Sequence, residues 1–282
     1  MGQPRILTIE AGDYHLMKKV ATIFVIVISI VLMIVGHIYW NEKIHQSVQQ
    51  ALAQNGSHAV NKESKQQDDR KKQFIEYAGN LPEAIQQKME NAIFSNQPVR
   101  LVIFGSEATS SDPKGWPNLL KHSLDDTYGS DLFSVTVKEY KDMTTTEAVQ
   151  EDIAQEIIAL KPDVILFEPF ILNNNGAVPI EQTLEDITTM LTEIQSALPD
   201  VVVMLQPAHP IYNARYYPME VDELKRYAKE KGYIYLDHWT SWPDYKSAEI
   251  KNYIAEDDST PNEDGHRLWA DFLKDYFIAK KQ

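Results

Sequence analysis

The sequence predicts an α/β domain of three layers, in which helices cover both faces of a five-stranded parallel sheet. From residue 99 onward, short apolar runs alternate with stretches whose apolar residues recur at helical spacing. One run, DVILFEPF at 163–170, is almost continuously apolar, which is typical of a strand covered on both faces. Most connections between these segments are short. Strands that alternate with helices in this way form a parallel sheet.

The predicted strands and helices follow one another along the chain. Strands are expected at 99–104, 132–140, 163–170, 201–206 and 233–237. Helices are expected at 116–129, 145–160, 180–198, 219–232 and 261–280. In the second of these helices, Val149, Ile153 and Ile157 share one face. Gly232 follows the fourth helix as a stop signal.

The N-terminal part contains an apolar stretch at residues 20–40 that has no Asp, Glu, Lys or Arg. Roughly 20 such residues are enough to cross a bilayer, so we expect one transmembrane helix here. Lys18 and Lys19 directly precede the stretch. The positive-inside rule therefore predicts that residues 1–19 are a cytoplasmic tail and that the rest is extracellular. The long apolar run and the lack of a small-residue cleavage motif favour a retained cell-membrane anchor over a cleaved signal peptide.

Two segments connect this stretch to the predicted globular domain at 99–282. Residues 41–73 are polar and poor in apolar side chains, which indicates a stalk. Residues 74–98 regain apolar residues at helical spacing, and Pro82 suits the first turn of a helix. We expect this segment to be a lead-in helix that docks on the domain.

The composition excludes several classes of function. The chain carries 41 Asp and Glu against 27 Lys and Arg, a formal net charge of −14, so no nucleic-acid partner is expected. The chain has no cysteine, which excludes a cysteine nucleophile and thiolate metal sites. The histidines and acidic residues show no metal-ligand spacing, so we expect neither a metal nor another cofactor.

Polar side chains follow the predicted strands at the edge where ligands bind in an open parallel sheet. In strand order these residues are Ser106 and Glu107, then Glu168 and the NNNG at 173–176, then Gln206 and His209, then Asp237, His238 and Trp239. Asp257, Asp258 and His266 come shortly before or within the last helix. A hydroxyl, amides, carboxylates and imidazoles on one edge are the groups that a serine esterase uses.

The chain from about 99 to 280 resembles the SGNH (GDSL-type) serine hydrolases, which implies a flavodoxin-like α/β/α fold. IFGSEAT resembles their first block, which implies that Ser106 is the nucleophile. EPFILNNNG resembles the third block, which implies that Asn173 supports the oxyanion, and DDSTPNEDGHRLWADFL resembles the final block. The EPF-LN-NG and LDHW--WPD stretches are similar to those of membrane-anchored SGNH proteins of Gram-positive bacteria.

The sequence departs from the family pattern at several places. The first block lacks its usual Asp, since Glu107 follows the Gly-Ser pair directly. The second block should supply a backbone N–H from a glycine, but EYKDMTTTEA has Asp142 or Met143 near that position. Ile171 stands for the glycine of the third block, and Thr260 for the histidine of the last.

The general base is therefore open between three histidines. His266 lies near the start of the last helix, where its side chain leans back toward the strand ends. His238 directly follows the fifth strand, and His209 lies on the irregular loop after the fourth. Asp257 is the expected orienter of the base, with Asp258 as its alternative. Triads are defined by geometry and not by sequence order, so each arrangement is permitted.

We expect a cell-surface esterase or acyltransferase that acts on small O-acyl esters, such as acetyl groups, of cell-envelope glycans. Ser106 would attack the ester, and Asn173 would support the oxyanion. His209 and the loop aromatic Trp239 would contact the substrate, since aromatic faces suit sugar rings. The alternative is a catalytically inactive SGNH fold that binds a glycan or a partner in envelope or capsule assembly. A weaker option is an esterase or thioesterase that acts on lipid acyl chains.

Overall fold

The sheet of the domain is five-stranded and fully parallel, with the strand order β2-β1-β3-β4-β5. The computed structural model describes residues 69, 72, 74 and 76–279. The strands are β1 (Val99–Gly105), β2 (Phe133–Glu139), β3 (Val164–Glu168), β4 (Val202–Leu205) and β5 (Ile234–Tyr235). The chain order reverses between β1 and β3, which are neighbours in the sheet. In folds of this type that reversal opens a crevice at the carboxyl ends of the strands.

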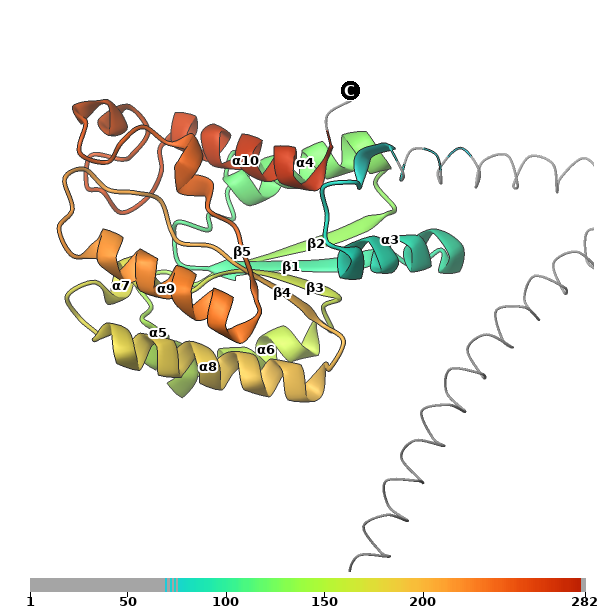
Figure 1. Cartoon of the computed structure of the whole chain (residues 1–282), viewed down its shortest axis with the longest axis horizontal. Helices are drawn as coiled ribbons and strands as arrows, with labels where there is room; N and C mark the ends of the chain where they lie inside the picture. The colour runs from blue at the N-terminus through green and yellow to red at the C-terminus, as the bar shows by residue number, and fades with distance from the viewer. Residues whose placement is uncertain (1–68, 70–71, 73, 75, 280–282) are drawn as a thin grey trace, which may run out of the picture. The chain divides into compact units, whose positions relative to one another are not determined.

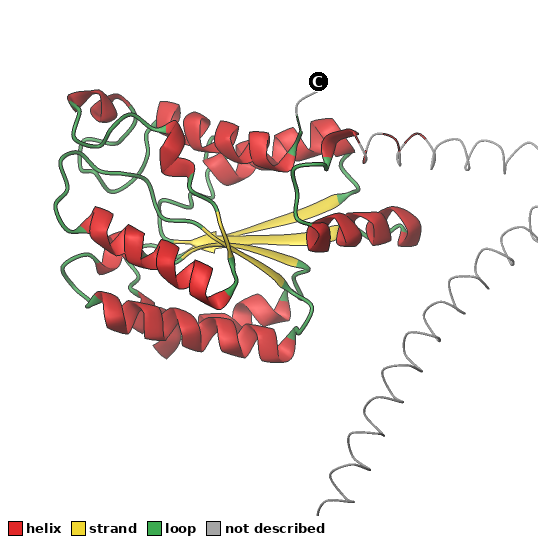
Figure 2. Ribbon diagram, viewed as in Figure 1, coloured by secondary structure: helices red, strands yellow, loops and turns green. Residues whose placement is uncertain are grey.

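Helices cover both faces of the sheet, which confirms the predicted three-layer architecture (Figures 1 and 2). The helices are α3 (Glu83–Ser95), α4 (Trp116–Tyr128), α5 (Thr145–Gln150), α6 (Ile153–Ala159), α7 (Ile171–Asn174), α8 (Ile180–Ala197), α9 (Tyr217–Lys231) and α10 (Glu263–Phe277). Two 3₁₀ turns, η1 (His238–Ser241) and η2 (Ala248–Asn252), precede α10. Helices α4 and α10 pack together on one face, while α5, α6, α8 and α9 lie on the other (Figure 1).

The core consists of apolar side chains from the central strands and from the helices above and below them. Every residue of β3 is buried, as its continuous apolar run predicts. Phe104 and Phe167 stack between β1 and β3 with ring centroids 4.0 Å apart. Trp116 and Trp269 stack at 4.7 Å and join α4 to α10. The carboxyl ends of the strands are thus fixed by large buried aromatic groups.

The strand register brings three residues to one edge of the sheet. Gly105 ends β1 and pairs with Glu139 of β2 on one side and with Glu168 of β3 on the other. The residues directly after Gly105 therefore start beside two carboxyl groups. The candidate site is built on this edge.

Two elements differ from the sequence prediction. The helix expected at 145–160 is two helices, because Asp152 adopts a left-handed backbone with φ of 58° between α5 and α6. The strand expected at 233–237 pairs only through Ile234 and Tyr235, since the chain turns into η1 at His238. The NNNG stretch at 173–176 begins within the short helix α7.

The predicted cytoplasmic tail at 1–19 and transmembrane helix at 20–40 lie outside the described residues, as does nearly all of the stalk at 41–73. In the described part of the chain, no helix is both long and apolar enough to cross a membrane. Helix α3 falls within the lead-in segment predicted at 74–98, and its Ile85 and Met89 are fully buried.

Candidate active site

Ser106 lies at the end of β1, and its hydroxyl contacts a glutamate. The Ser106 hydroxyl donates to Glu168 Oε2 at 2.6 Å, and the Ser106 backbone N–H donates to the same oxygen at 2.8 Å. Thr109 Oγ1 adds a third, longer contact to this oxygen at 3.3 Å. The serine is 1% exposed and the glutamate is 0% exposed. No hydrogen bond joins Ser106 to a histidine within the part of the chain that the structure describes.

Gly105 makes this contact possible because a side chain at its position would collide with the glutamate. An ideal Cβ on Gly105 would lie 2.6 Å from the Glu168 carbonyl oxygen and 2.7 Å from its Oε2. Contacts this short require the strands to move apart. The glycine thus lets the Glu168 carboxyl fold back against β1 and reach the next residue.

The surroundings of Glu168 favour its protonated form. The pKa of Glu168 is raised to about 8, because burial and, to a smaller extent, the charge of Glu107 outweigh the hydrogen bonds from Ser106 and Thr109, which lower it. Its second oxygen, Oε1, is buried and has no hydrogen-bond partner. Removal of a carboxylate from water disfavours the charged form, and this effect exceeds that of the hydrogen bonds here.

Two N–H donors of the site converge on Glu107. The Asn173 side-chain amide donates to Glu107 Oε2 at 3.0 Å, and the Asp142 backbone N–H donates to the same oxygen at 3.2 Å. These are the donors that the family resemblance implies for an oxyanion. In this conformation, however, they hold a carboxylate oxygen of the chain itself. Glu107 is partly exposed, in contrast to its neighbour Ser106.

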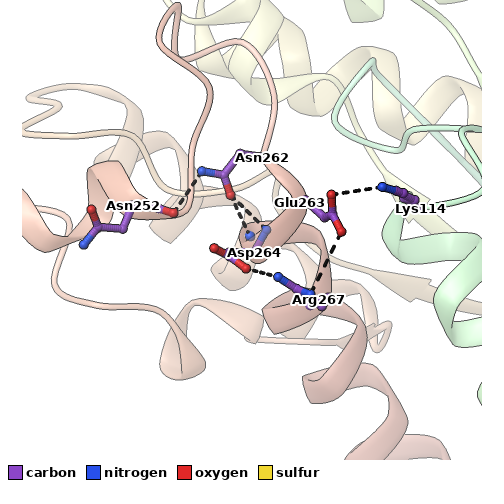
Figure 3. A network of polar contacts seen from close by, with 7 residues as sticks. Lys114, Asn252, Asn262, Glu263, Asp264 and Arg267 are labelled. Atoms are coloured by element: carbon purple, nitrogen blue, oxygen red, sulfur yellow. Dashed lines mark hydrogen bonds and ion pairs between the residues drawn. The ribbon is translucent and has the colours of Figure 1, made fainter.

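His266 lies near the start of α10, which is anchored by its N-cap residue Asn262 (Figure 3). The Trp116 backbone N–H donates to His266 Nδ1 at 3.4 Å. With Nδ1 as acceptor, the neutral ring carries its proton on Nε2. Burial lowers the pKa of His266 to about 4, so the ring is neutral at physiological pH. The structure therefore places His266 beside α4 and does not bring it into hydrogen-bond contact with Ser106.

His238 has both ring nitrogens occupied. Trp242 Nε1 donates to its Nδ1 at 2.9 Å, and its Nε2 donates to the Pro207 carbonyl at 2.9 Å. The ring stacks on Trp269 with centroids 4.0 Å apart and is fully buried. Burial lowers the pKa of His238 to about 3. The expectation that His238 can serve as the base is corrected, because this imidazole is a buried packing element without a free lone pair.

The remaining predicted residues do not meet at Ser106. His209 is fully buried, and its Nε2 contacts the Asp258 carbonyl at 3.2 Å, so it is not positioned to touch a substrate. Asp257 is exposed and accepts from the Ser259 backbone N–H and hydroxyl, and no hydrogen bond joins it to a histidine among the described residues. Trp239 is partly buried and donates from Nε1 to the Ala208 carbonyl at 2.7 Å.

The structure brings Ser106 and Asn173 to the same edge of the sheet, but the two side chains contact different residues. Each contacts a glutamate. Glu168 stands in the sequence at the end of an apolar strand, at the ligand-binding edge, but the pattern does not predict its contact with Ser106. The contact of Glu107 with the oxyanion donors has no comparable sequence signal.

The fold is similar to that of several solved structures of ester hydrolases. A G-D-S-L family protein from Desulfitobacterium hafniense DCB-2 superposes with a TM-score of 0.53 at 18% identity, over 63% of this chain and 99% of that one. A mutant of the acetylxylan esterase Axe2 from Geobacillus stearothermophilus gives 0.53 at 15% identity, over 64% and 94%. The psychrotrophic esterase EstA from Pseudoalteromonas sp. gives 0.51 at 17% identity, over 63% and 96%. No protein-family model and no curated protein matches the sequence. The strand order, the layers and these similarities together establish that the chain has the fold of the SGNH (GDSL-type) ester hydrolases.

Proposed function

We propose that the domain hydrolyses or transfers a small O-acyl ester, with Ser106 as the nucleophile. The observation that carries this proposal is the convergence of the Asn173 amide and the Asp142 backbone N–H on one oxygen position. Donors arranged in this way stabilise the negative oxygen of a tetrahedral intermediate, and one such donor is typically worth about 10²–10³ in rate. Glu107 Oε2 marks where the substrate carbonyl oxygen would lie once the Glu107 side chain moves away.

Acetyl groups on cell-envelope glycans are the substrate class that we propose. Two of the proteins with a similar fold are acetylxylan esterases, which supports an acetyl ester on a sugar. The apolar stretch at 20–40 supports attachment to the cell membrane with the domain on the outer side. Since one fold hosts many functions, the fold alone does not identify the substrate, and the site residues must be tested with candidate substrates.

The test is covalent labelling of the full chain with a fluorophosphonate probe, in detergent because residues 20–40 are predicted to span a membrane. We expect labelling of wild type and of Ser111→Ala, and loss of labelling in Ser106→Ala. Ser111 is a matched control because its hydroxyl also donates to a glutamate, Glu139, at 2.6 Å. Labelling that persists in Ser106→Ala would refute Ser106 as the nucleophile. Hydrolysis of p-nitrophenyl esters of increasing chain length would separate an acetyl esterase from one that acts on lipid acyl chains.

A second candidate function is non-catalytic binding of a glycan or an assembly partner. It is favoured by the low exposure of Ser106 and by the Glu107 carboxylate on the oxyanion donors. In that case, the folded wild-type chain stays unlabelled but binds an acetylated xylo-oligosaccharide in a calorimetric titration. Trp239→Ala would then weaken binding, whereas Ser106→Ala would leave it unchanged.

A further inference from the structure

The hydroxyl of Ser106 points at a single strong acceptor. Glu168 Oε2 lies 2.6 Å from Ser106 Oγ, which is within the range in which a general base takes a proton directly. The three histidines that the sequence suggests have other partners. These are Trp116 for His266, Pro207 and Trp242 for His238, and the Asp258 carbonyl for His209. We propose that Glu168 is the general base that removes the proton of Ser106, in the role that histidine has in other serine esterases. This inference rests on the proposed function.

A second serine–glutamate pair in the same domain has the same hydrogen bonds as Ser106 and Glu168 but different surroundings. Ser111 donates to Glu139 Oε2 from its hydroxyl at 2.6 Å and from its backbone N–H at 2.8 Å, the same two contacts at the same distances. Glu139, however, is partly exposed and pairs with Lys141 at 3.3 Å. The hydrogen bonds from Ser111 and the charge of Lys141 hold the pKa of Glu139 below its ordinary value despite partial burial.

The two glutamates therefore differ in base strength and not in geometry. A carboxylate with a low pKa is a poor acceptor for the proton of an alcohol, because catalytic bases work best with a pKa near the operating pH. Burial and the nearby Glu107 charge bring the pKa of Glu168 to about 8, within that range. Other enzymes also use burial to raise the pKa of a catalytic glutamate.

The acyl-transfer step balances with these residues alone. The Ser106 O–H bond breaks, its proton passes to Glu168 Oε2, and Oγ forms a bond to the ester carbonyl carbon. The carbonyl oxygen receives the negative charge and accepts from Asn173 and Asp142. The bond to the alcohol then breaks, and Glu168 returns the proton to the leaving oxygen. In the second half, Glu168 takes a proton from a water molecule, or from a sugar hydroxyl in transfer, and the oxygen of that group bonds to the acyl carbon. The bond from this carbon to Ser106 Oγ then breaks, and Glu168 returns the proton to Oγ.

The pH dependence of the labelling rate distinguishes Glu168 from a histidine as the base, and the groups that face Glu168 influence its titration. On the β1 side these groups are the Ser106 and Thr109 hydroxyls and the Glu107 carboxylate, and from α9 the nearby group is the Tyr217 phenol. The base form of Glu168 predominates above about pH 8, so the labelling rate should rise up to that pH and then level off. His266, with a pKa of about 4, would give a rate that is constant above about pH 5.

The experiment measures fluorophosphonate labelling rates of the full chain between pH 5 and 10 for wild type, Glu168→Gln, His266→Ala and Glu139→Gln. Glu168→Gln should lower the rate by about 10²–10⁴-fold, the usual contribution of a general base. Glu168→Asp should have a rate between those of Glu168→Gln and wild type. It keeps a carboxylate, but its shorter side chain places this group farther from Ser106. Glu139→Gln, the matched control, should label like wild type. Circular dichroism and thermal unfolding of each variant show that a lost rate does not reflect a lost fold.

The possible results separate this inference from the proposed function. Labelling kept in Glu168→Gln and lost in His266→Ala, or a wild-type rate that is flat from pH 5 to 10, would overturn the role of Glu168 but leave Ser106 as nucleophile. A folded wild-type chain that shows no labelling at any pH would overturn both.

Discussion

Two glutamates in the candidate site have opposite surroundings, and the mechanism that we propose gives them opposite roles. Glu168 contacts hydroxyl and backbone donors of the turn after β1, and its burial raises its pKa to about 8. Glu107 is partly exposed and lies on the two donors that would hold an oxyanion. A carboxylate on these donors resembles the charge distribution of the tetrahedral intermediate. In the proposed mechanism, Glu107 therefore competes with the substrate carbonyl oxygen for these donors.

Removal of this competitor should increase the reactivity of Ser106. In Glu107→Ala the Asn173 and Asp142 N–H groups become free to bind an incoming oxygen. A hydrogen bond to a charged group contributes about 1.5–3 kcal/mol, so we expect fluorophosphonate labelling to accelerate by about tenfold or more. The measurement is the labelling rate at a fixed pH above 8, where the base form of Glu168 predominates.

Glu107→Gln is the matched comparison for this prediction. Its amide oxygen can still accept from both donors, but without the full negative charge, so its rate should fall between those of wild type and Glu107→Ala. An alanine variant that labels no faster than wild type would show that Glu107 does not obstruct the oxyanion position.

The sequence could predict the place of the site better than its internal contacts. Ser106 and Asn173 reach one edge of the sheet because each follows a strand of a parallel sheet. The roles of the histidines depend instead on which distant groups meet their ring nitrogens, such as Trp242 and Pro207 for His238. Such contacts between remote segments leave no local pattern in the sequence.

At the scale of elements, Asn262 connects α10 to the segment before it (Figure 3). Its side-chain oxygen accepts from the backbone N–H groups of Asp264 and Gly265, and its amide donates to the carbonyls of Asn252 and Ile254. Around it, Glu263 pairs with Lys114 at 3.1 Å and Asp264 pairs with Arg267, but these charges are exposed. Exposed ion pairs contribute little, so the cap is the main local stabiliser of this helix start.

Asn262→Ala should lower the free energy of unfolding by about 1–2 kcal/mol, because loss of an N-cap side chain typically costs about 0.5–2 kcal/mol. Asn262→Asp keeps the cap acceptor and loses only the two donated bonds, so it should cost less. Urea unfolding of both variants gives the comparison. Equal stability of Asn262→Ala and wild type would mean that water replaces the cap without cost.

The elements also show where sequence patterns are sufficient and where they fail. The long helix α8 and the buried strand β3 follow directly from the spacing of their apolar residues. The break between α5 and α6 does not, because the apolar pattern at 145–160 continues across Asp152. Only the left-handed backbone of that residue ends the first helix, and an aspartate tolerates this conformation without requiring it.

At the scale of the whole molecule, the buried histidines and Glu168 should determine how the stability depends on pH. His209, His238 and His266 have pKa values lowered by burial to about 4, 3 and 4, from an ordinary 6.5. Below pH 6.5 the unfolded chain binds more protons at these rings than the folded one, so stability falls as pH falls. Glu168 acts in the opposite sense. Its pKa of about 8 lies above the ordinary 4.5, so the folded chain binds the extra proton and stability falls as pH rises from 4.5 to 8.

These opposing effects predict a maximum of stability near pH 6.5. Below it, the three histidines outweigh Glu168. Above it, these rings are neutral in both states, and the loss of the Glu168 proton lowers the stability. Each such group changes the free energy of unfolding by at most about 1.4 kcal/mol per pH unit, so wild type should lose up to about 2 kcal/mol between pH 6.5 and 8. Glu168→Gln should lose nothing over this interval but keep the decline at acid pH, which the histidines cause. Urea unfolding at pH 5, 6.5 and 8 measures all three points. If the wild-type stability is the same at pH 6.5 and 8, Glu168 is already ionised at pH 6.5 in the folded chain. Its pKa would then be lower than the mechanism requires.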